Sequence, residues 1–175
     1  KSFRAKQIHE WIWEKSAQSF DEMTNISSKT RELLSEKFVF NTLSIHSKQI
    51  SEDRTIKSAF KLFDGNIIES VLIPTDDRMT ACVSSQVGCS LTCKFCATGY
   101  MDRVRNLDPA EIYDQVVAVR NQAQEHYGIP LTNIVFMGMG EPLLNYTNVL
   151  KSIERITAPD GLNMSYKRIT VSTAG

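Results

Sequence analysis

The chain lacks the features that mark membrane, disordered or polycationic proteins. No apolar run approaches the roughly 18 residues that a membrane-spanning helix needs, and the first six residues lack the apolar core of a signal peptide. Basic and acidic side chains balance at 20 each among 175 residues, which excludes nucleic-acid binding by gross positive charge. A content of 42% hydrophobic and 23% charged residues excludes disorder and collagen. We therefore expect a globular, cytoplasmic protein with no membrane association.

Cysteine is absent from all positions outside residues 82–96. Within that segment lie all four, at Cys82, Cys89, Cys93 and Cys96. Disulfide scaffolds spread their cysteines to join distant loops, and they occur mainly in secreted proteins. Clustered cysteines without a secretory signal instead indicate a metal site.

Two metals are compatible with this cluster. Zinc usually takes paired CxxC motifs or CxxC with histidines, so here it would need Cys82 as a fourth ligand at an unusual spacing. The CxxxCxxC triplet of Cys89, Cys93 and Cys96 offers three thiolates on a short loop. Three thiolates can hold three irons of a [4Fe–4S] cluster and leave the fourth iron open. Free cysteines with no metal are the remaining possibility.

The cysteine triplet, with Phe95 before its last member, resembles the radical S-adenosylmethionine (radical SAM) superfamily. The longer string from Cys82 to Gly99 is similar to the RlmN family, which methylates carbon 2 of adenine in 23S rRNA and tRNA. A sister family, Cfr, methylates carbon 8, and Pro142 favours the carbon-2 branch. The similarity continues in three further strings: Arg105-Asn106-Leu107, Gly138-Met139-Gly140-Glu141-Pro142 and Thr170–Gly175.

The resemblance implies two cofactors and a set of residues that bind them. Cys89, Cys93 and Cys96 would hold a [4Fe–4S] cluster whose open iron binds S-adenosyl-L-methionine. A glycine-rich turn after an apolar strand suits close approach to a ligand, because glycine has no Cβ. By resemblance, the S-adenosylmethionine contacts are Gly140, Glu141 and Ser172, with Phe95 packing near the adenine or the cluster. By itself, Phe95 could equally be an ordinary core aromatic residue, and Ser172 a turn former.

The resemblance also implies two catalytic residues. Cys82 would resolve a covalent protein–RNA intermediate by forming a disulfide with a second cysteine, which carries the methyl group. Glu69, thirteen residues before Cys82, would be the general base that removes the adenine carbon-2 proton. No second cysteine of that kind follows Cys96, so we expect this chain alone to be inactive.

The first part of the chain predicts small accessory elements. Residues 1–42 are expected to form a helical unit, with an amphipathic helix at 3–16 and a capping box at Ser19–Glu22 that opens a short helix. The family resemblance implies that this unit docks RNA. Ser28 is predicted to cap a third helix carrying Leu33, Leu34 and Phe38. This core is too thin to be stable alone.

Residues 43–78 predict a β extension. Strands are expected at 43–50, 54–63 and 66–73, with Asp64-Gly65 as a two-residue hairpin turn. A polar turn follows at Asp76-Asp77-Arg78.

Residues 79–175 predict alternating strands and helices. Strands are expected at 80–84, 133–137 and 168–173. Asp108 and Pro109 begin the first helix, whose buried face contains Ile112, Val116, Val119 and Ala123 and which Gly128 ends. Asn145 is predicted to cap the second helix, with Val149, Leu150, Ile153 and Ile156 inward.

The predicted fold class is α/β: the first three strands of a (βα)6 radical SAM barrel, preceded by a small helical domain and a β-hairpin extension. Three strands cannot close a barrel, and three further units need roughly 100–150 residues. We therefore expect a fragment that lacks the C-terminal half. All the distinctive motifs follow strands, and in parallel barrels those loops carry function.

The expected partners are 23S rRNA, tRNA and an external flavodoxin-like electron donor. Two alternatives stay open. One is the carbon-8 methyltransferase of the Cfr branch. The other is a non-catalytic RNA-binding module that holds zinc or a cluster.

Overall fold

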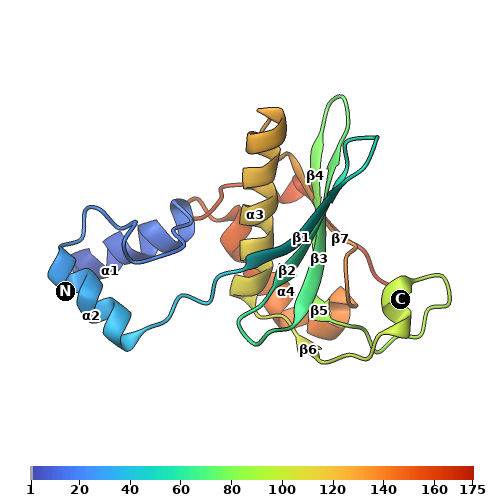
Figure 1. Ribbon diagram of the computed structural model, residues 1–175, viewed down its shortest axis with the longest axis horizontal. Coiled ribbons are helices and arrows are strands. Elements are labelled where there is room, and N and C mark those ends of the chain that lie inside the picture. Colours follow the sequence, from blue (N-terminus) through green and yellow to red (C-terminus); the bar gives the residue numbers. More distant parts are fainter. Residues whose placement is uncertain (1) are drawn as a thin grey trace.

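The computed structural model describes residues 2–175, and its elements form a helical unit followed by a mixed sheet with two covering helices (Figure 1). The helical unit contains α1 (Ser2–His9), the π-helical turn η1 (Glu10–Glu14) and α2 (Ser28–Lys37). The main sheet has the order β1-β2-β3-β4-β7-β8. No helix among the described residues is both long and apolar enough to cross a membrane.

The first predicted helix is confirmed, and the second is wrong. α1 and η1 continue into one another, and Trp11 and Ile12 pack on a small core of Ala17, Met23 and Ile26. Glu22 does accept hydrogen bonds from the Gln18 N–H and the Ser19 hydroxyl, but no helix follows. Two successive turns bury Met23 and Ile26 instead, so tertiary packing overrides the local capping signal.

The third predicted helix exists, but its apolar residues are not buried. α2 is preceded by Ser27 as N-cap, one residue before the predicted cap at Ser28. Leu33 is 49% exposed, and Phe38 lies beyond the helix end and is 61% exposed. The apolar spacing therefore predicted the helix correctly but not its packing within this chain.

The helical unit packs on the sheet domain through Trp13, as its thin core requires. The Trp13 ring meets the Tyr113 ring edge-on with centroids 5.1 Å apart, and the Tyr113 hydroxyl donates to the Trp13 carbonyl. The Arg155 guanidinium lies 5.7 Å from the centre of the Trp13 ring. Arg120 donates to the Ser16 hydroxyl at 3.3 Å. Aromatic and cationic contacts of this kind stabilise the interface beyond simple burial.

The β extension is an antiparallel meander of β1 (Ser44–Ile50), β2 (Ile56–Lys61) and β3 (Ile67–Pro74). The predicted hairpin at Asp64-Gly65 is present, with Gly65 at φ +84°. Its loop is one residue longer than predicted, because the Leu62 N–H bonds the Asn66 carbonyl and leaves three residues between them. A three-residue loop with glycine in the left-handed region is a common hairpin form. The polar turn at Asp76–Arg78 is also present.

The predicted strand–helix alternation is confirmed. β4 (Met79–Cys82) pairs antiparallel with β3 and parallel with β7 (Asn133–Phe136), which pairs parallel with β8 (Ile169–Val171). α3 (Pro109–Tyr127) and α4 (Tyr146–Thr157) connect these strands. The order β4-α3-β7-α4-β8 is therefore the start of a parallel α/β barrel. A two-stranded sheet of β5 (Gln86–Val87) and β6 (Arg105–Asn106) lies in the connection before α3.

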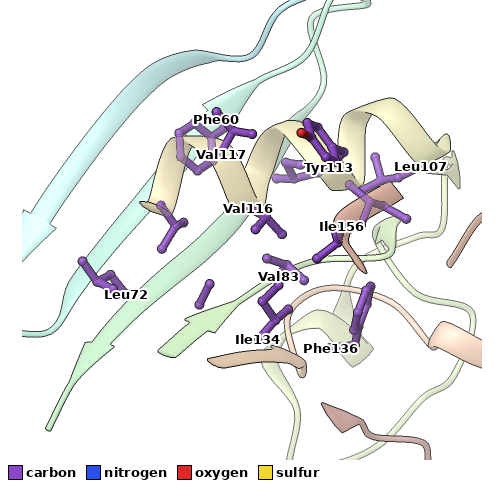
Figure 2. Close-up of a cluster of buried hydrophobic side chains, with 14 of the residues drawn as sticks. Phe60, Leu72, Val83, Leu107, Tyr113, Val116, Val117, Ile134, Phe136 and Ile156 are labelled. Atoms are coloured by element: carbon purple, nitrogen blue, oxygen red, sulfur yellow. The ribbon is translucent and has the colours of Figure 1, made fainter. Parts of the chain in front are cut away.

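Helix α3 is the element that the sequence predicts most completely. Asp108 caps its N-terminus in a capping box with Glu111, Pro109 is its first residue, and Gly128 ends it in the left-handed conformation. Helix α3 covers one face of the sheet (Figure 2). Its four predicted inward residues are fully buried: Ile112, Val116, Val119 and Ala123. The opposite side of this core is formed by strand residues and the residue after β4: Phe60, Leu72, Val83, Ile134 and Phe136.

Helix α4 differs from its prediction in two respects. Val149 and Ile156 are buried, but Leu150 is 42% exposed and Ser152 is buried in its place. Asn145 ends the 3₁₀ turn η3 (Pro142–Asn145) and does not cap α4 with its side chain. The amide group of Asn145 is used elsewhere, as described below.

Candidate functional site

Three loops leave the sheet at the carboxyl ends of its parallel strands, and they contain the motifs singled out in the sequence. A long connection from residue 83 to residue 108 joins β4 to α3 and contains the cysteine triplet. Residues Gly138–Glu141 follow β7, and Ser172–Gly175 follow β8. In parallel α/β folds this edge of the sheet is the usual position of the active site. The structure therefore brings these three loops to one edge of the sheet.

The three thiols of the triplet lie on one exposed loop. Cys89, Cys93 and Cys96 form no disulfide and are half-buried. Two backbone turns make the segment compact: the Cys96 N–H donates to the Cys93 carbonyl, and the Gly99 N–H donates to the Cys96 carbonyl. A cavity of about 540 Å³ adjoins Cys89 and is lined on its other side by the 3₁₀ turn η2 (Ala97–Tyr100) and by Asp102.

The donor set suits an iron–sulfur cluster better than zinc. Three soft thiolates without a nearby histidine are the normal ligands of such clusters. Cys82 is buried at the end of β4, on a strand and not on the triplet's loop, which disfavours it as a fourth zinc ligand. Among residues 2–175, no three Cys, His, Asp or Glu side chains already converge as a metal site. Binding a cluster therefore requires the three thiols of this surface loop to turn toward one point.

Phe95 is 94% exposed, so it is not a core aromatic residue of this chain. Tyr100, on the same loop, is 80% exposed, although its hydroxyl donates to the Lys94 carbonyl at 3.1 Å. Both rings are therefore accessible to a bound cofactor or to another part of the protein.

The two glycines after β7 are explained by close packing inside the chain. A Cβ on Gly138 would lie 2.7 Å from the Ser84 hydroxyl and 2.8 Å from the Val83 carbonyl carbon. Gly140 adopts φ +95°, and a Cβ there would lie 2.5 Å from the Cβ of Gln86. The glycines thus let the loop after β7 lie directly on the loop after β4. The predicted contact of Gly140 with a ligand remains a proposal.

Glu141 joins two of the three loops. It is 7% exposed, and its carboxylate accepts hydrogen bonds from the Leu143 N–H at 3.0 Å and from the Ala174 N–H at 2.9 Å. Burial by itself would raise the pKa of Glu141, but these two N–H donors and the Thr173 hydroxyl hold that pKa below its ordinary value. The group is therefore an anion at neutral pH. Ser172, predicted as a ligand contact, is half-buried beside this junction.

The two predicted catalytic residues share one face of the sheet. Cys82 pairs with Val71 across β3 and β4, and Glu69 lies two residues before Val71 on β3. Side chains two residues apart on a strand point the same way, so Glu69 and Cys82 are diagonal neighbours, typically about 7–8 Å apart. This face is opposite to α3, because Ser70, the next residue on β3, bonds Gln115 of α3. It is the face that a closed barrel would enclose.

The environments of these two side chains differ. The Glu69 carboxylate is half-exposed and pairs with the Lys57 ammonium at 3.0 Å. Cys82 is buried, and burial raises the pKa of its thiol against a smaller opposing effect of the Met137 N–H. Cys82 is therefore a thiol and not a thiolate in this chain, and its reactivity depends on a proton acceptor.

Polar residues that sequence reasoning did not single out hold the site together. Gln115 accepts hydrogen bonds from the Ser70 hydroxyl and the Ser84 N–H, each at 2.9 Å. The Ser84 hydroxyl donates to the Glu69 carbonyl at 2.6 Å and accepts from the Met139 N–H. Asn145 donates to the carbonyls of Ser85 and Leu107. The one available signal was the polar Ser84-Ser85-Gln86 run directly after an apolar strand.

One sizeable cavity lies away from these loops. It measures about 610 Å³, between the helical unit and α3, and its lining includes Trp13, Phe38 and Asp114 but none of the predicted site residues. Its walls are mostly apolar, and two of its carboxylates, Asp108 and Glu111, form the capping box of α3. We therefore place the functional site at the three loops.

Comparison with known families agrees with this geometry. Residues 83–175, more than half of the chain, match the model of the radical SAM superfamily. This chain belongs to the radical SAM superfamily. Members of that superfamily use S-adenosylmethionine and an iron–sulfur cluster. Residues 1–40 match the model described as the ribosomal RNA large subunit methyltransferase N-terminal domain.

Similar radical SAM proteins are about twice as long as this chain. The chain is 65% identical to a probable dual-specificity RNA methyltransferase RlmN of Cytophaga hutchinsonii, covering 100% of this chain and 48% of the relative. A protein of the same description from Christiangramia forsetii is 61% identical, with 100% and 50% covered. The crystal structure of a radical SAM methyltransferase from Sphaerobacter thermophilus matches with a TM-score of 0.91 and 42% identity, over 99% of this chain and 51% of that one. The resemblance inferred from the cysteine motifs is thereby confirmed.

Proposed function

We propose that this chain is the N-terminal half of a radical SAM methyltransferase that methylates carbon 2 of an adenine in 23S rRNA and tRNA, in the cytoplasm. The observation that carries the proposal is the junction of three loops at one sheet edge, with the cysteine triplet, Glu141 and Ser172 contributed by different strands. Its similarity to RlmN proteins over the whole chain supports RNA as the substrate.

In this proposal, Cys89, Cys93 and Cys96 bind a [4Fe–4S] cluster. With S-adenosylmethionine and an electron from a flavodoxin-like donor, the bound cluster would supply the radical chemistry that removes a hydrogen atom from an unreactive carbon. Glu141, held as an anion, accepts hydrogen bonds from the ligand's ammonium group through lone pairs that its two backbone donors leave free. Ser172 and the Gly140 backbone lie beside it, and Phe95 covers the adenine or the cluster.

The shared face of Glu69 and Cys82 supports roles for both residues in one reaction. A methyl-carrying cysteine on another segment would lose a hydrogen atom to the radical that the cofactors supply, and its carbon would then bond to adenine carbon 2. Glu69 removes the proton that carbon 2 carried, and the one electron left on the adduct would return to the oxidised cluster. The Cys82 sulfur then attacks the sulfur of that thioether. A disulfide forms as the sulfur–carbon bond breaks, and the released carbon takes up a proton to become the new methyl group. Turnover in this proposal therefore requires a further cysteine besides Cys82 and the triplet.

The helical unit at residues 1–42 is proposed to dock folded RNA by shape and phosphate contacts, with residues 43–78 as a β extension between it and the barrel. The target adenine must leave its stack to reach the face that carries Glu69 and Cys82.

The test uses the full-length protein, reconstituted anaerobically with iron and sulfide and supplied with S-adenosylmethionine, an electron donor and an RNA containing the target adenine. We expect a brown protein that absorbs near 400 nm, on the order usual for thiolate-bound [4Fe–4S] clusters, and 2-methyladenosine in the digested RNA. 8-Methyladenosine would instead place the protein in the carbon-8 branch. A colourless protein with one bound zinc would overturn the enzyme proposal.

Two substitutions test the assigned residues. Glu69→Gln should abolish methylation and leave the cluster absorbance intact, whereas Glu154→Gln, on the outer helix α4, should change neither. Cys82→Ala should accumulate a covalent protein–RNA adduct. Full turnover by Glu69→Gln would remove that residue from the mechanism.

A further inference from the structure

Gln86 is a fully buried glutamine at the point where the loops after β4 and β7 meet. It lies on β5, three residues before Cys89, and is 0% exposed. Its amide nitrogen donates to the Asn106 side-chain oxygen at 2.7 Å, and its amide oxygen accepts from the Glu141 N–H at 2.9 Å. The Gln86 amide therefore donates a hydrogen bond within the cysteine-bearing connection and accepts one from the loop after β7.

The hydrogen bonds of Gln86 continue into the third loop. The Glu141 N–H donates to the Gln86 amide oxygen, and the Glu141 carboxylate accepts a hydrogen bond from the Ala174 N–H at 2.9 Å. At the other end, Asn106 accepts from Arg103 at 3.0 Å and donates to the Leu144 carbonyl at 3.3 Å. The chain Asn106–Gln86–Glu141–Ala174 thus crosses all three loops of the site.

Packing leaves little freedom at this junction. A Cβ on Gly140 would lie 2.5 Å from the Gln86 Cβ and 2.6 Å from its Cγ, so the Gln86 stem presses directly on the Gly140 backbone. The Gln86 N–H also donates to the Met139 carbonyl at 3.1 Å. A buried amide in a tight contact holds its partners at one separation, because any shift leaves a buried donor or acceptor unpaired.

We propose that Gln86 is a positioning residue that sets the placement of Glu141 relative to the cysteine triplet, so that both engage one S-adenosylmethionine molecule. The inference rests on the proposed function of the three loops. It assigns Gln86 no direct contact with the cofactor. Its effect is on ligand affinity, because the cluster-bearing loop and the Glu141 loop must be at the right distance before the ligand arrives.

The test compares two buried glutamines in the full-length protein with its cluster reconstituted. Gln86→Met keeps the length of the side chain and removes both amide hydrogen bonds. Gln122→Met is the matched control, since Gln122 is 4% exposed and its amide nitrogen bonds Ser58, on the side of the sheet away from the loops. Gln122→Met should lose less stability than Gln86→Met in urea denaturation, because it removes one amide hydrogen bond and an oxygen that has no partner among the described residues. Only Gln86→Met should weaken S-adenosylmethionine binding, by about tenfold or more.

A second variant and a cofactor-free readout keep the test decisive. Asn106→Ala removes the same hydrogen bond from its other end, and its effect on the dissociation constant should not add to that of Gln86→Met. In cluster-free protein, Gln86→Met should accelerate amide hydrogen exchange at Glu141 and Ala174, and Gln122→Met should not. Equal dissociation constants for both glutamine variants, with wild-type binding intact, would overturn this inference alone. Failure of the wild-type protein to bind S-adenosylmethionine would overturn the proposed function and this inference with it.

Discussion

Arg105 donates hydrogen bonds to both carboxylate oxygens of Glu111, each at 2.7 Å, and Glu111 is only 4% exposed. The same guanidinium bonds Asp64 of the β2–β3 hairpin at 2.7 Å and lies 5.4 Å from the Phe63 ring. The hydrogen bond from Arg105 is the main cause that lowers the pKa of Asp64 to about 2. Arg105 thus ties the end of the cysteine-bearing connection to α3 and to the β extension.

Replacing Arg105 should destabilise the fold much more than replacing a neighbouring arginine. Arg105→Met leaves Glu111 as a buried carboxylate without its partner, which costs about 2–4 kcal/mol of unfolding free energy after allowing for the partial exposure of Arg105. Arg103→Met, which loses one hydrogen bond at an exposed site, should cost about 0.5 kcal/mol or less. Urea denaturation measures both, and equal losses would show that the Arg105 pair does not stabilise the fold.

The four cysteines should separate by reactivity in cluster-free protein. Cys82 is buried and the pKa of its thiol is raised, whereas the triplet thiols are half-exposed. At pH 8, iodoacetamide should modify three cysteines rapidly and Cys82 at least about tenfold more slowly, because the thiolate is the reacting species. Mass spectrometry of the time course counts the modified sites, and Cys82→Ser should remove only the slow phase. Four sites with one common rate would contradict the buried position of Cys82.

Two glycine substitutions should differ in severity for a reason visible in the structure. Gly138→Ala places a Cβ 2.7 Å from the Ser84 hydroxyl and 2.8 Å from the Ser84 nitrogen, where the backbone cannot move freely. Gly128→Ala has open space and suffers only from its φ of +65°, at a cost of about 1–2 kcal/mol. We expect Gly138→Ala to lower the thermal midpoint further than Gly128→Ala. A smaller effect at Gly138 would mean that the loop after β7 can separate from Ser84.

Asp114 should make stability depend on pH in an unusual direction. Burial first, and then the carboxylates of Asp108 and Glu111, raise the pKa of Asp114 to about 7. Because that pKa lies above its unfolded value of 3.8, the folded chain binds the extra proton, and stability falls as the pH rises from about 4 to about 7.

Asp114→Asn should remove this dependence. At pH 8 its thermal midpoint should exceed the wild-type value by about 2–4 °C, which corresponds to about 1 kcal/mol for a half-buried group in a chain of this size. Near pH 4 the two proteins should be alike. Asp76→Asn, in an exposed turn, is the control. If Asp114→Asn raised the thermal midpoint as much at pH 4 as at pH 8, the increase would not come from removal of the charge.

Much of the fold could be predicted because its signals are local. Asp108, Pro109 and Gly128 mark the ends of α3 by their own backbone preferences, and the spacing of Ile112 and Val116 predicts which side is buried. Asp64-Gly65 likewise predicts the hairpin. These residues act on atoms a few positions away, so no tertiary contact is needed to interpret them.

The wrong predictions concern residues whose positions depend on distant partners. The Ser19 hydroxyl bonds the Glu22 carboxylate, but the two residues form neither a capping box nor a helix start, because Met23 and Ile26 pack into the small core. Leu150 has a helical apolar spacing but is 42% exposed. Asn145 occupies the N-cap of α4 as predicted, but its side chain donates to the Ser85 and Leu107 carbonyls instead of bonding the first turn of the helix. Periodicity shows that a side of a helix is apolar but does not show what covers it.

The amino-acid sequence by itself determined the chemistry available to this protein: a thiol triplet suited to an iron–sulfur cluster, and strands that alternate with helices so that every motif follows a strand. The tertiary structure decided the arrangement of that chemistry. Strand register places Glu69 on the same face as Cys82, and packing on Gly140 makes Gln86 the link between two loops. Residue types and spacing act locally, whereas register and close packing join residues far apart in the chain, and only the folded structure determines those.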